Sequence, residues 1–294
     1  MFSTVSCEPQ ASAPMTTMQT RASCLAATRS GALGAVLAST ALLCSFALYA
    51  QDNSPRRIGK HLEIAEALLA EVAPENTSYR HKNNVVKRKS TDEAACCHAD
   101  CSGLINWLLL ESEARPPAAL ELWLKSKRPV ARHYHDAIVA EKYFLRVHEL
   151  KHCYPGDVIA VKYPKDNENT GHVMLVVEKP KKRTPTAPII AGAEQWEVVV
   201  IDCSTSPHSA DTRSVKGGEN HTGLGRGTFR IYADAQGGPI GYSWSLGARS
   251  EYRPATDRPL VIGRFRPNGN ESGDSVKKVT ANPLPPGVIV DRTD

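Results

Sequence analysis

The sequence lacks three patterns, and each absence narrows the functions open to it. Its 294 residues contain no basic stripe with interleaved aromatic side chains, and the formal net charge is only +5, so we expect no nucleic-acid partner. No segment repeats along the chain, which argues against a repeat architecture. The Cys- and His-rich residues 96–101 have no second ligand pair to complete a tetrahedral site, which argues against bound zinc.

The composition is that of a soluble globular protein, with 41% hydrophobic and 23% charged residues. The length allows one large domain or two small ones. Part of the positive charge is gathered in residues 179–183, a run with Pro180 inside it and Pro185 just after it. This run favours a solvated loop, and attraction to an anionic polymer is the alternative.

Residues 1–50 have the layout of a targeting segment. Arg21 and Arg29 precede an almost uncharged apolar stretch, residues 31–50, that ends in small residues. This order is typical of a secretory signal peptide, cleaved after Ala50. The stretch is also long enough to span a membrane if it stays uncleaved. We therefore expect an exported protein whose only membrane contact, if it has one, is residues 31–50.

Cysteine is informative once the targeting segment is set aside. Five cysteines then remain, and an odd number in an exported protein suggests that one thiol stays free for chemistry. We assign this role to Cys101. The other four either form two disulfides, whose pairing the sequence does not give, or pack as small hydrophobic side chains. They are Cys96, Cys97, Cys153 and Cys203.

Helical patterns dominate the chain up to about residue 145. Apolar residues at helical spacing predict a helix over residues 60–72. We expect further helices over residues 94–112 and 118–125. Residues 136–145 allow a helix or a strand, and we favour a helix over 136–143. The polar residues 77–92 are expected to form an extended loop over the site.

From residue 150 onward the pattern changes to strands. Apolar runs bounded by turn residues predict strands over residues 158–161, 172–178, 196–202 and 260–265, with a hairpin over 223–233 and 241–245. Helices followed by an antiparallel sheet make an α+β fold. We take residues 58–267 as the folded domain and 51–57 as a linker. Residues 268–294, rich in Pro, Asn, Gly and Ser, are expected to be disordered.

Cys101 lies at the start of an apolar run, residues 104–110, that we expect to be helical. A thiol at a helix N-terminus lies near free backbone N–H groups and the positive end of the helix dipole, which lower its pKa and favour the thiolate. The same N–H groups can stabilise an oxyanion. The alternative is a structural cysteine on a buried helix.

His172 and Asp202 belong to two predicted strands that follow one another along the chain. If these strands pair antiparallel with His172 opposite Asp202, the carboxylate can orient the imidazole and raise its basicity. The alternative is that Asp202 caps the turn at residues 204–206. His208 is then the nearest alternative orienter in the sequence.

Three short blocks together resemble the signature of a known family. Residues 100–103 (Asp-Cys-Ser-Gly), 155–158 (Pro-Gly-Asp-Val) and 171–173 (Gly-His-Val) are similar to the motifs of the NlpC-type cell-wall peptidases, the papain-like cysteine hydrolases of bacterial envelopes. The resemblance spans residues 58–265. It implies a papain-like fold, with N-terminal helices packed on an antiparallel β-sheet.

The resemblance implies roles for three catalytic residues. Cys101 is implied as the nucleophile and His172 as the general base. Asp202 falls where the family places its third polar residue, a position that often carries His. These roles agree with those argued above from the positions of the three side chains.

The resemblance also implies three residues that contact substrate. Tyr79 matches an upstream tyrosine of the family that lines the site and assists the oxyanion, although the usual glycine pair after it is missing. Asp100 and Ser102 are implied to bind a substrate's free amine. The alternatives are that Tyr79 only packs and that Asp100 caps the helix.

These observations predict a periplasmic or extracellular thiol hydrolase that cleaves an amide bond in peptidoglycan stem peptides through an acyl-enzyme on Cys101. The chemistry needs no metal or organic cofactor. Three alternatives stay open: an acyltransferase or amidase acting on another envelope substrate, a catalytically inactive wall-binding module, and a structural envelope protein. No separate wall-binding repeat is present, so recognition depends on the domain itself or on a partner.

Overall fold

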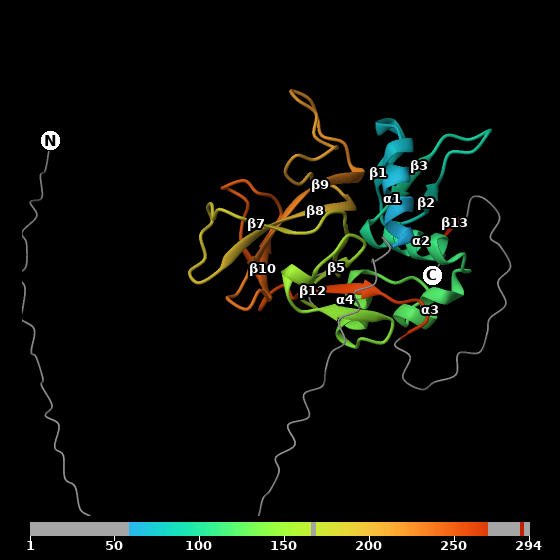
Figure 1. The fold of residues 1–294 in the computed structure, drawn as a ribbon. Helices are drawn as coiled ribbons and strands as arrows, with labels where there is room; N and C mark the ends of the chain where they lie inside the picture. Colours follow the sequence, from blue (N-terminus) through green and yellow to red (C-terminus); the bar gives the residue numbers. More distant parts are fainter. Residues whose placement is uncertain (1–58, 166–168, 270–288, 291–294) are drawn as a thin grey trace, which may run out of the picture. The chain divides into compact units, whose positions relative to one another are not determined.

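The computed structural model describes residues 59–165, 169–269 and 289–290, all within one compact unit. Its fold is α+β, with a few helices and one large antiparallel sheet (Figure 1). The predicted signal peptide, residues 1–50, the linker, residues 51–57, and most of the predicted tail lie outside the described residues. Within the described part of the chain, no helix has the length and apolar character needed to cross a membrane.

The large sheet has nine strands, and every pair of neighbours in it is antiparallel. Its order is β11-β10-β9-β8-β6-β5-β12-β4, and β7 pairs with β8 beside this path. The strands are β4 (Phe144–Val147), β5 (Val158–Lys162), β6 (Gly171–Val176), β7 (Lys181–Arg183), β8 (Glu194–Ser204), β9 (Gly223–Ala233), β10 (Pro239–Ser243), β11 (Arg253–Pro254) and β12 (Leu260–Phe265).

The central strands of this sheet are buried on both faces. On β6, Val173 and Leu175 belong to the core under the helices, whereas Met174 and Val176 belong to a second core on the opposite face. This division follows from the strand geometry, because successive side chains point to opposite faces. The sheet curls around the second core, so that β10 comes close to β12.

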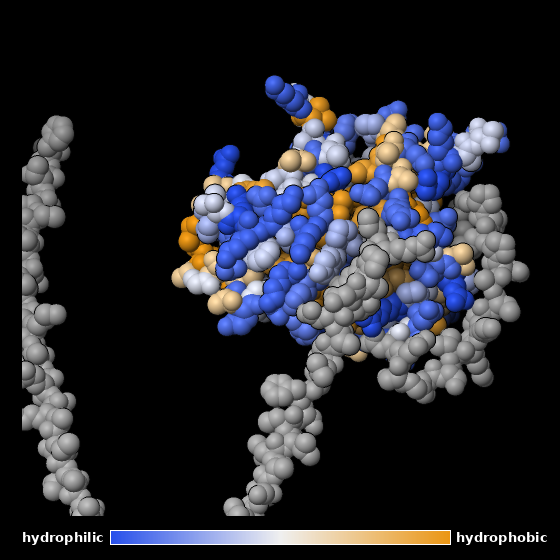
Figure 2. Space-filling model, in the orientation of Figure 1, coloured by the Kyte–Doolittle hydropathy of each residue, from blue (hydrophilic) through white to orange (hydrophobic). Residues whose placement is uncertain are grey.

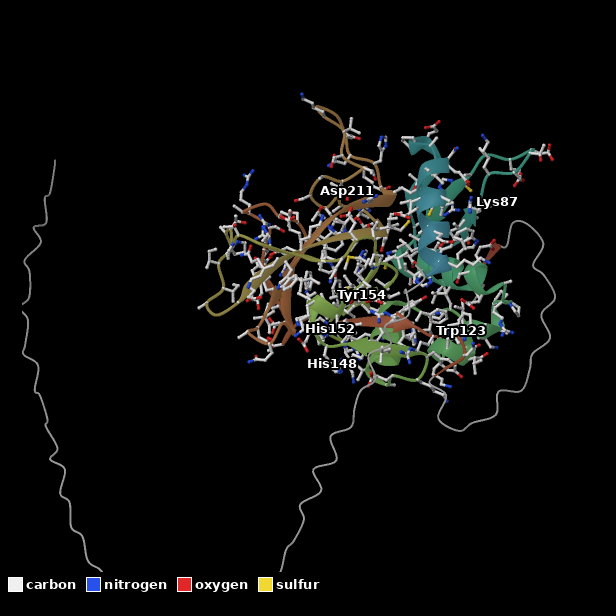
Figure 3. All side chains as sticks on the ribbon, viewed as in Figure 1. Lys87, Trp123, His148, His152, Tyr154 and Asp211 are labelled. Carbon is white, nitrogen blue, oxygen red and sulfur yellow. The ribbon has the colours of Figure 1, made fainter. Side chains whose placement is uncertain are left out.

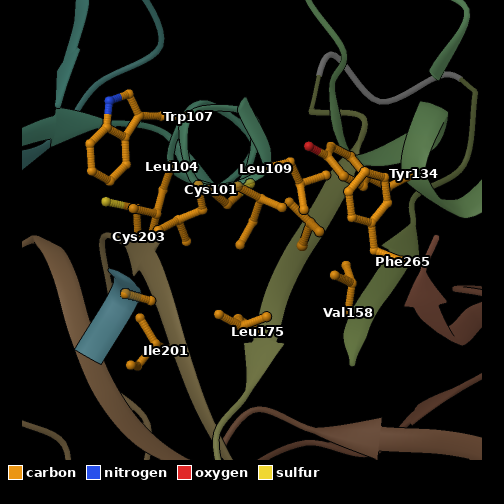
Figure 4. Close-up of a cluster of buried hydrophobic side chains, with 14 of the residues drawn as sticks. Cys101, Leu104, Trp107, Leu109, Tyr134, Val158, Leu175, Ile201, Cys203 and Phe265 are labelled. Atoms are coloured by element: carbon orange, nitrogen blue, oxygen red, sulfur yellow. The ribbon is translucent and has the colours of Figure 1, made fainter. Parts of the chain in front are cut away.

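Helices cover the other face of the sheet. They are α1 (Lys60–Glu71), α2 (Cys101–Glu113), α3 (Ala118–Leu124) and α4 (Ala131–Val139). Helix α2 packs on β6 and β8, α4 packs on β5 and β12, and α1 packs on α2. Figure 4 shows Leu104 and Leu109 of α2 above Leu175 and Ile201 of the sheet. Since α2 is buried on nearly all sides, its N-terminus is held firmly against β6.

A small second sheet adjoins the large one. Its order is β1-β3-β2-β13, with β1 (Thr77–Tyr79) parallel to β3 (Cys96–Ala99), and with β2 (Asn84–Lys87) and β13 (Ile289–Val290) antiparallel. Strand β1 approaches β9 so closely that a Cβ atom on Gly223 would lie 2.3 Å from Oγ1 of Thr77. Gly223 also has φ +100, a conformation that favours glycine.

Several predicted elements differ from the observed ones. The helix predicted over residues 94–112 begins only at Cys101, because residues 96–99 form β3. The predicted loop 77–92 contains β1 and β2, so strands separate α1 from α2. The helix predicted over 136–143 lies earlier, as α4, and is followed by β4.

The basic run 179–183 is not a free loop. Residues 181–183 form β7, and each of their cationic side chains faces a carboxylate. The pairs are Lys181 with Glu178, Lys182 with Glu194, and Arg183 with Glu197. Because these cations are paired, the run gives no support to an anionic polymer as partner. Figure 2 shows hydrophilic areas alternating with small hydrophobic patches on one face of the molecule.

Candidate active site

Cys101 is the first residue of α2, and Asp100 is its N-cap. Oδ1 of Asp100 accepts hydrogen bonds from the backbone N–H of Gly103 at 2.6 Å and from the hydroxyl of Ser102 at 3.0 Å. An aspartate at this position satisfies a backbone donor that the helix cannot satisfy itself. The cap fixes where α2 begins and therefore where the thiol lies.

The second oxygen of Asp100 is also occupied. Its Oδ2 lies 2.8 Å from Nη2 of Arg128 and 3.4 Å from Nδ1 of His81. With the two donors on Oδ1, three hydrogen bonds reach a carboxylate that has about four acceptor sites. In this structure Ser102 donates to Asp100, and Arg128 compensates the charge of Asp100. That Asp100 and Ser102 bind a substrate amine stays a prediction.

The thiol of Cys101 is only 5% exposed. Burial and the carboxylate of Asp100 raise its pKa to about 12, against the opposing effect of the backbone N–H groups of Val173 and Ser102. The expected lowering of this pKa is therefore wrong. The helix N-terminus is present, but desolvation of the thiolate outweighs it.

His172 and Asp202 are in direct contact. Nε2 of His172 lies 2.6 Å from Oδ2 of Asp202, and both side chains are buried. The predicted register is wrong by two residues, since β6 and β8 pair Leu175 with Ile201. A shift of two keeps both side chains on the same face of the sheet, so the contact forms diagonally.

Asp202 lies at the centre of a buried group of charges. Its Oδ2 also lies 3.1 Å from Nε2 of His208, and its Oδ1 lies 2.8 Å from Nη2 of Arg213, as an ion pair rather than an aligned hydrogen bond. Arg213 in turn pairs with Asp211 at 2.7 Å. Asp211 lies in the loop after β8 (Figure 3). Burial alone would raise the pKa of Asp202, but the charges of His208 and Arg213 and the bonds from both histidines hold it well below its usual range.

The bonds of His208 define its protonation. Its Nδ1 lies 2.7 Å from the backbone carbonyl of Trp244, and its Nε2 faces the carboxylate of Asp202. Both partners only accept hydrogen bonds, so both ring nitrogens of His208 carry protons. His208 and Arg213 then supply two positive charges against Asp202 and Asp211, and the buried group is neutral.

A cavity of about 240 Å³ opens beside His172. Its walls are Tyr79, Tyr163, Asn169, His172, Ser204, Thr205, Ser206 and Trp244. The Trp244 ring lies edge-on to His172, with centroids 4.9 Å apart, and against His208 at 4.3 Å. Burial and the neighbouring Cys101 and Asp100 raise the pKa of Tyr79, so its hydroxyl keeps its proton and can donate.

The remaining cysteines are free thiols, so the two disulfides considered from the sequence are not formed in this structure. Cys97 faces Cys203, and His98 bonds to Ser78 through its Nδ1 at 2.9 Å. The side chains of residues 96–101 thus point to different partners. No cluster of three or more metal-ligating side chains occurs in residues 59–165 or 169–269.

Three residues of the site were not foreseen. Arg213 and Asp211 lie in a polar segment that reads as a solvated loop, and Trp244 lies in a hairpin more than seventy residues after His172. No local pattern marks them, because their partners are distant in the chain. His208 was considered only as a substitute for Asp202, whereas it binds the same carboxylate.

No protein-family model matches the chain, and no solved structure matches it. Among curated proteins, it is similar to Uncharacterized protein R653 of Acanthamoeba polyphaga mimivirus, with 33% identity over 213 residues. The match covers 68% of this chain and 94% of the mimivirus protein.

Proposed function

The chain belongs to one family with the mimivirus protein R653, and on the geometry of its site we propose that it is a cysteine hydrolase that cleaves an amide bond. One observation carries the proposal: His172 is held by Asp202 at 2.6 Å beside the N-terminus of the helix that begins with Cys101. The thiol of Cys101 contacts the backbone N–H of Val173, the residue that follows His172 on β6.

The bond to Asp202 decides which nitrogen of His172 acts as the base. An ionised carboxylate only accepts hydrogen bonds, so Nε2 of His172 carries the proton. Nδ1 then has its lone pair free to accept the proton of the thiol. Asp202 keeps this tautomer and stabilises the positive charge that the ring acquires.

The thiol of Cys101 keeps its proton at rest, because burial raises its pKa to about 12. Sγ attacks the carbonyl carbon as its proton moves to His172, which later gives that proton to the leaving amine. Water, activated by the same nitrogen, then releases the acyl group. We assign the stabilisation of the oxyanion to the backbone N–H of Cys101 and to the hydroxyl of Tyr79, which keeps its proton.

The cavity wall indicates an uncharged group on the substrate. Among the described residues that line it there is no Asp, Glu, Lys or Arg. Peptide stems of peptidoglycan, with their alanine residues, remain the proposed substrate on the resemblance of residues 100–103, 155–158 and 171–173 to NlpC-type peptidases. The papain-like fold is part of the same proposal, supported by the nucleophile's helix packing on the strand of the histidine.

Mass spectrometry of defined stem peptides, incubated with the full chain, tests the proposed function. We expect one amide bond to be cleaved, no cleavage by Cys101→Ala, and normal cleavage by Cys153→Ala, which removes a buried thiol outside the site. An amine acceptor added to the reaction would reveal acyl transfer as a ligated product. Cleavage that survives Cys101→Ala would contradict the proposal.

The pH dependence of alkylation tests whether the thiol of Cys101 keeps its proton at rest. Iodoacetamide should modify Cys101 at a rate that keeps rising with pH above 8, with no plateau on the acidic side of neutrality. Cys101 should still react before Cys153, because its side chain is 5% exposed and that of Cys153 is 0% exposed. An acidic plateau would show a preformed thiolate–imidazolium pair instead.

A further inference from the structure

Two buried thiols that take no part in the proposed chemistry face each other. The Sγ atoms of Cys97 on β3 and Cys203 on β8 lie 3.5 Å apart, although 106 positions separate the residues in the sequence. Both side chains are 0% exposed. Cys96 precedes Cys97 on β3 and points to the opposite face of the strand, so it does not compete for Cys203.

The backbone around the two thiols is held from several directions. Oγ1 of Thr77 donates to the carbonyl of Cys97 at 2.9 Å and accepts from the backbone N–H of Leu224 at 2.8 Å. Thr77 is also the ladder partner of Cys97, and Leu224 is the ladder partner of Cys203. Thr77 and Leu224 therefore already connect the backbone at Cys97 to the backbone at Cys203. The two sulfur atoms face each other across this connection.

We propose that Cys97 and Cys203 form a disulfide that joins the small sheet to the large sheet. Each thiol loses its proton and a sulfur–sulfur bond of about 2.05 Å forms, so the sulfur atoms must approach each other by roughly 1.5 Å. The two electrons reduce a disulfide oxidant, such as glutathione disulfide, to two thiols. The exchange passes through a mixed disulfide on one of the two cysteines.

The bond has a structural consequence for the site. Cys203 directly follows Asp202, and β3 ends one residue before the helix cap at Asp100. The disulfide therefore links β8, which carries Asp202, to the segment from β3 to Asp100, which positions Cys101. Burial raises the pKa of Cys203, so exchange is slow in the folded protein and the bond forms while the two sheets are coming together.

Peptide mapping of the full chain tests the proposal directly. The protein is refolded with reduced and oxidised glutathione, its thiols are blocked with iodoacetamide in denaturant, and it is digested with a protease that cuts before aspartate. Because Asp100 separates Cys97 from Cys101, we expect peptide 92–99 linked to peptide 202–210. The same link in Cys96→Ser identifies Cys97 as the partner. Alkylation of both Cys97 and Cys203, or a link from Cys203 to Cys101, would overturn the proposal.

Thermal unfolding provides the second measurement. A reductant should lower the Tm of the oxidised protein by about 5–10 °C, since a disulfide closing a long loop restricts the unfolded chain. The double variant Cys97→Ala, Cys203→Ala should show no response to reductant, and Cys153→Ala should respond like the unmodified protein. An unchanged Tm on reduction of a linked protein would show that the bond does not join the sheets. These outcomes are independent of the proposed hydrolysis, because neither the peptide mapping nor the Tm measures cleavage of a substrate.

Discussion

Asp202 carries two functions at the residue scale, because the carboxylate that orients His172 also compensates His208 and Arg213. Asp202→Asn should therefore lower the free energy of unfolding by about 3–5 kcal/mol, the usual cost of leaving a buried charge without its partner. It should also lower the rate by about 10- to 1000-fold. Asp202→Ala should be worse on both counts.

Urea unfolding and peptide cleavage, each at a temperature where the variants are folded, measure these effects. Glu178→Gln provides the control, because it breaks only exposed pairs, with Arg226 and Lys181, and should cost less than about 1 kcal/mol. If Asp202→Asn unfolds like the unmodified protein, the buried charges are not coupled through Asp202.

His208 should act on the reaction only through Asp202. We expect nitrogen NMR to show both of its ring nitrogens protonated at neutral pH, as its two acceptor partners require. His208→Gln removes a positive charge that lies next to Asp202. The carboxylate of Asp202 then stabilises a charged His172 more strongly. The acidic limb of the kcat/KM profile should move to higher pH. A lower rate with an unmoved profile would indicate a purely structural role.

Single residues differ in how far the sequence reveals them. Cys101, His172 and Asp202 stand at the ends of regular elements, where local patterns give their positions. The contact between His172 and Asp202 was predicted from a register that is wrong by two residues, because only the parity of the pairing decides which side chains share a face. The burial that raises the pKa of Cys101 comes from packing, which no local pattern reports.

The start of α2 is the decisive feature at the element scale, since Asp100 caps this helix and its charge raises the pKa of Cys101. Asp100→Asn should keep the cap, because asparagine serves as well at this position, and should lose only the ion pair with Arg128, at a cost of about 1 kcal/mol. Cys101 should then react faster with iodoacetamide at pH 8. Asp100→Ala should cost about 1–2 kcal/mol through the lost cap. Equal alkylation rates in all three proteins would exclude an effect of this charge.

Strands with a continuous apolar run of their own were predictable, and short strands without one were not. The strands over residues 158–161 and 260–265 were predicted and are observed as β5 and β12. Strand β3 was missed because its four residues run almost directly into α2 and pair with β1 about twenty residues away. Short strands of this kind are stabilised by their partners rather than by their own sequence.

At the scale of the whole molecule, burial of weak acids predicts that the protein loses stability in alkali. Burial raises the pKa of Cys101 to about 12 and raises the pKa values of Tyr79 and Tyr163. In the unfolded chain the pKa of a thiol is about 8.5 and that of a phenol is about 10. The native state therefore keeps protons that the unfolded state has lost, and the free energy of unfolding falls as the pH rises.

For Cys101 the contribution is fully present below pH 8.5 and is lost progressively as the pH rises toward 12, at up to about 1.4 kcal/mol per pH unit. Above pH 9 the free energy of unfolding of Cys101→Ala should fall less steeply with pH than that of the unmodified protein, by the slope that one proton contributes. Below pH 8 the two curves should run parallel. Urea unfolding at intervals between pH 7 and 10.5 measures both slopes. Identical slopes above pH 9 would mean that the thiol of Cys101 ionises as readily in the folded protein as in the unfolded chain. The proton transfer to His172 would then have to be replaced by attack of a preformed thiolate.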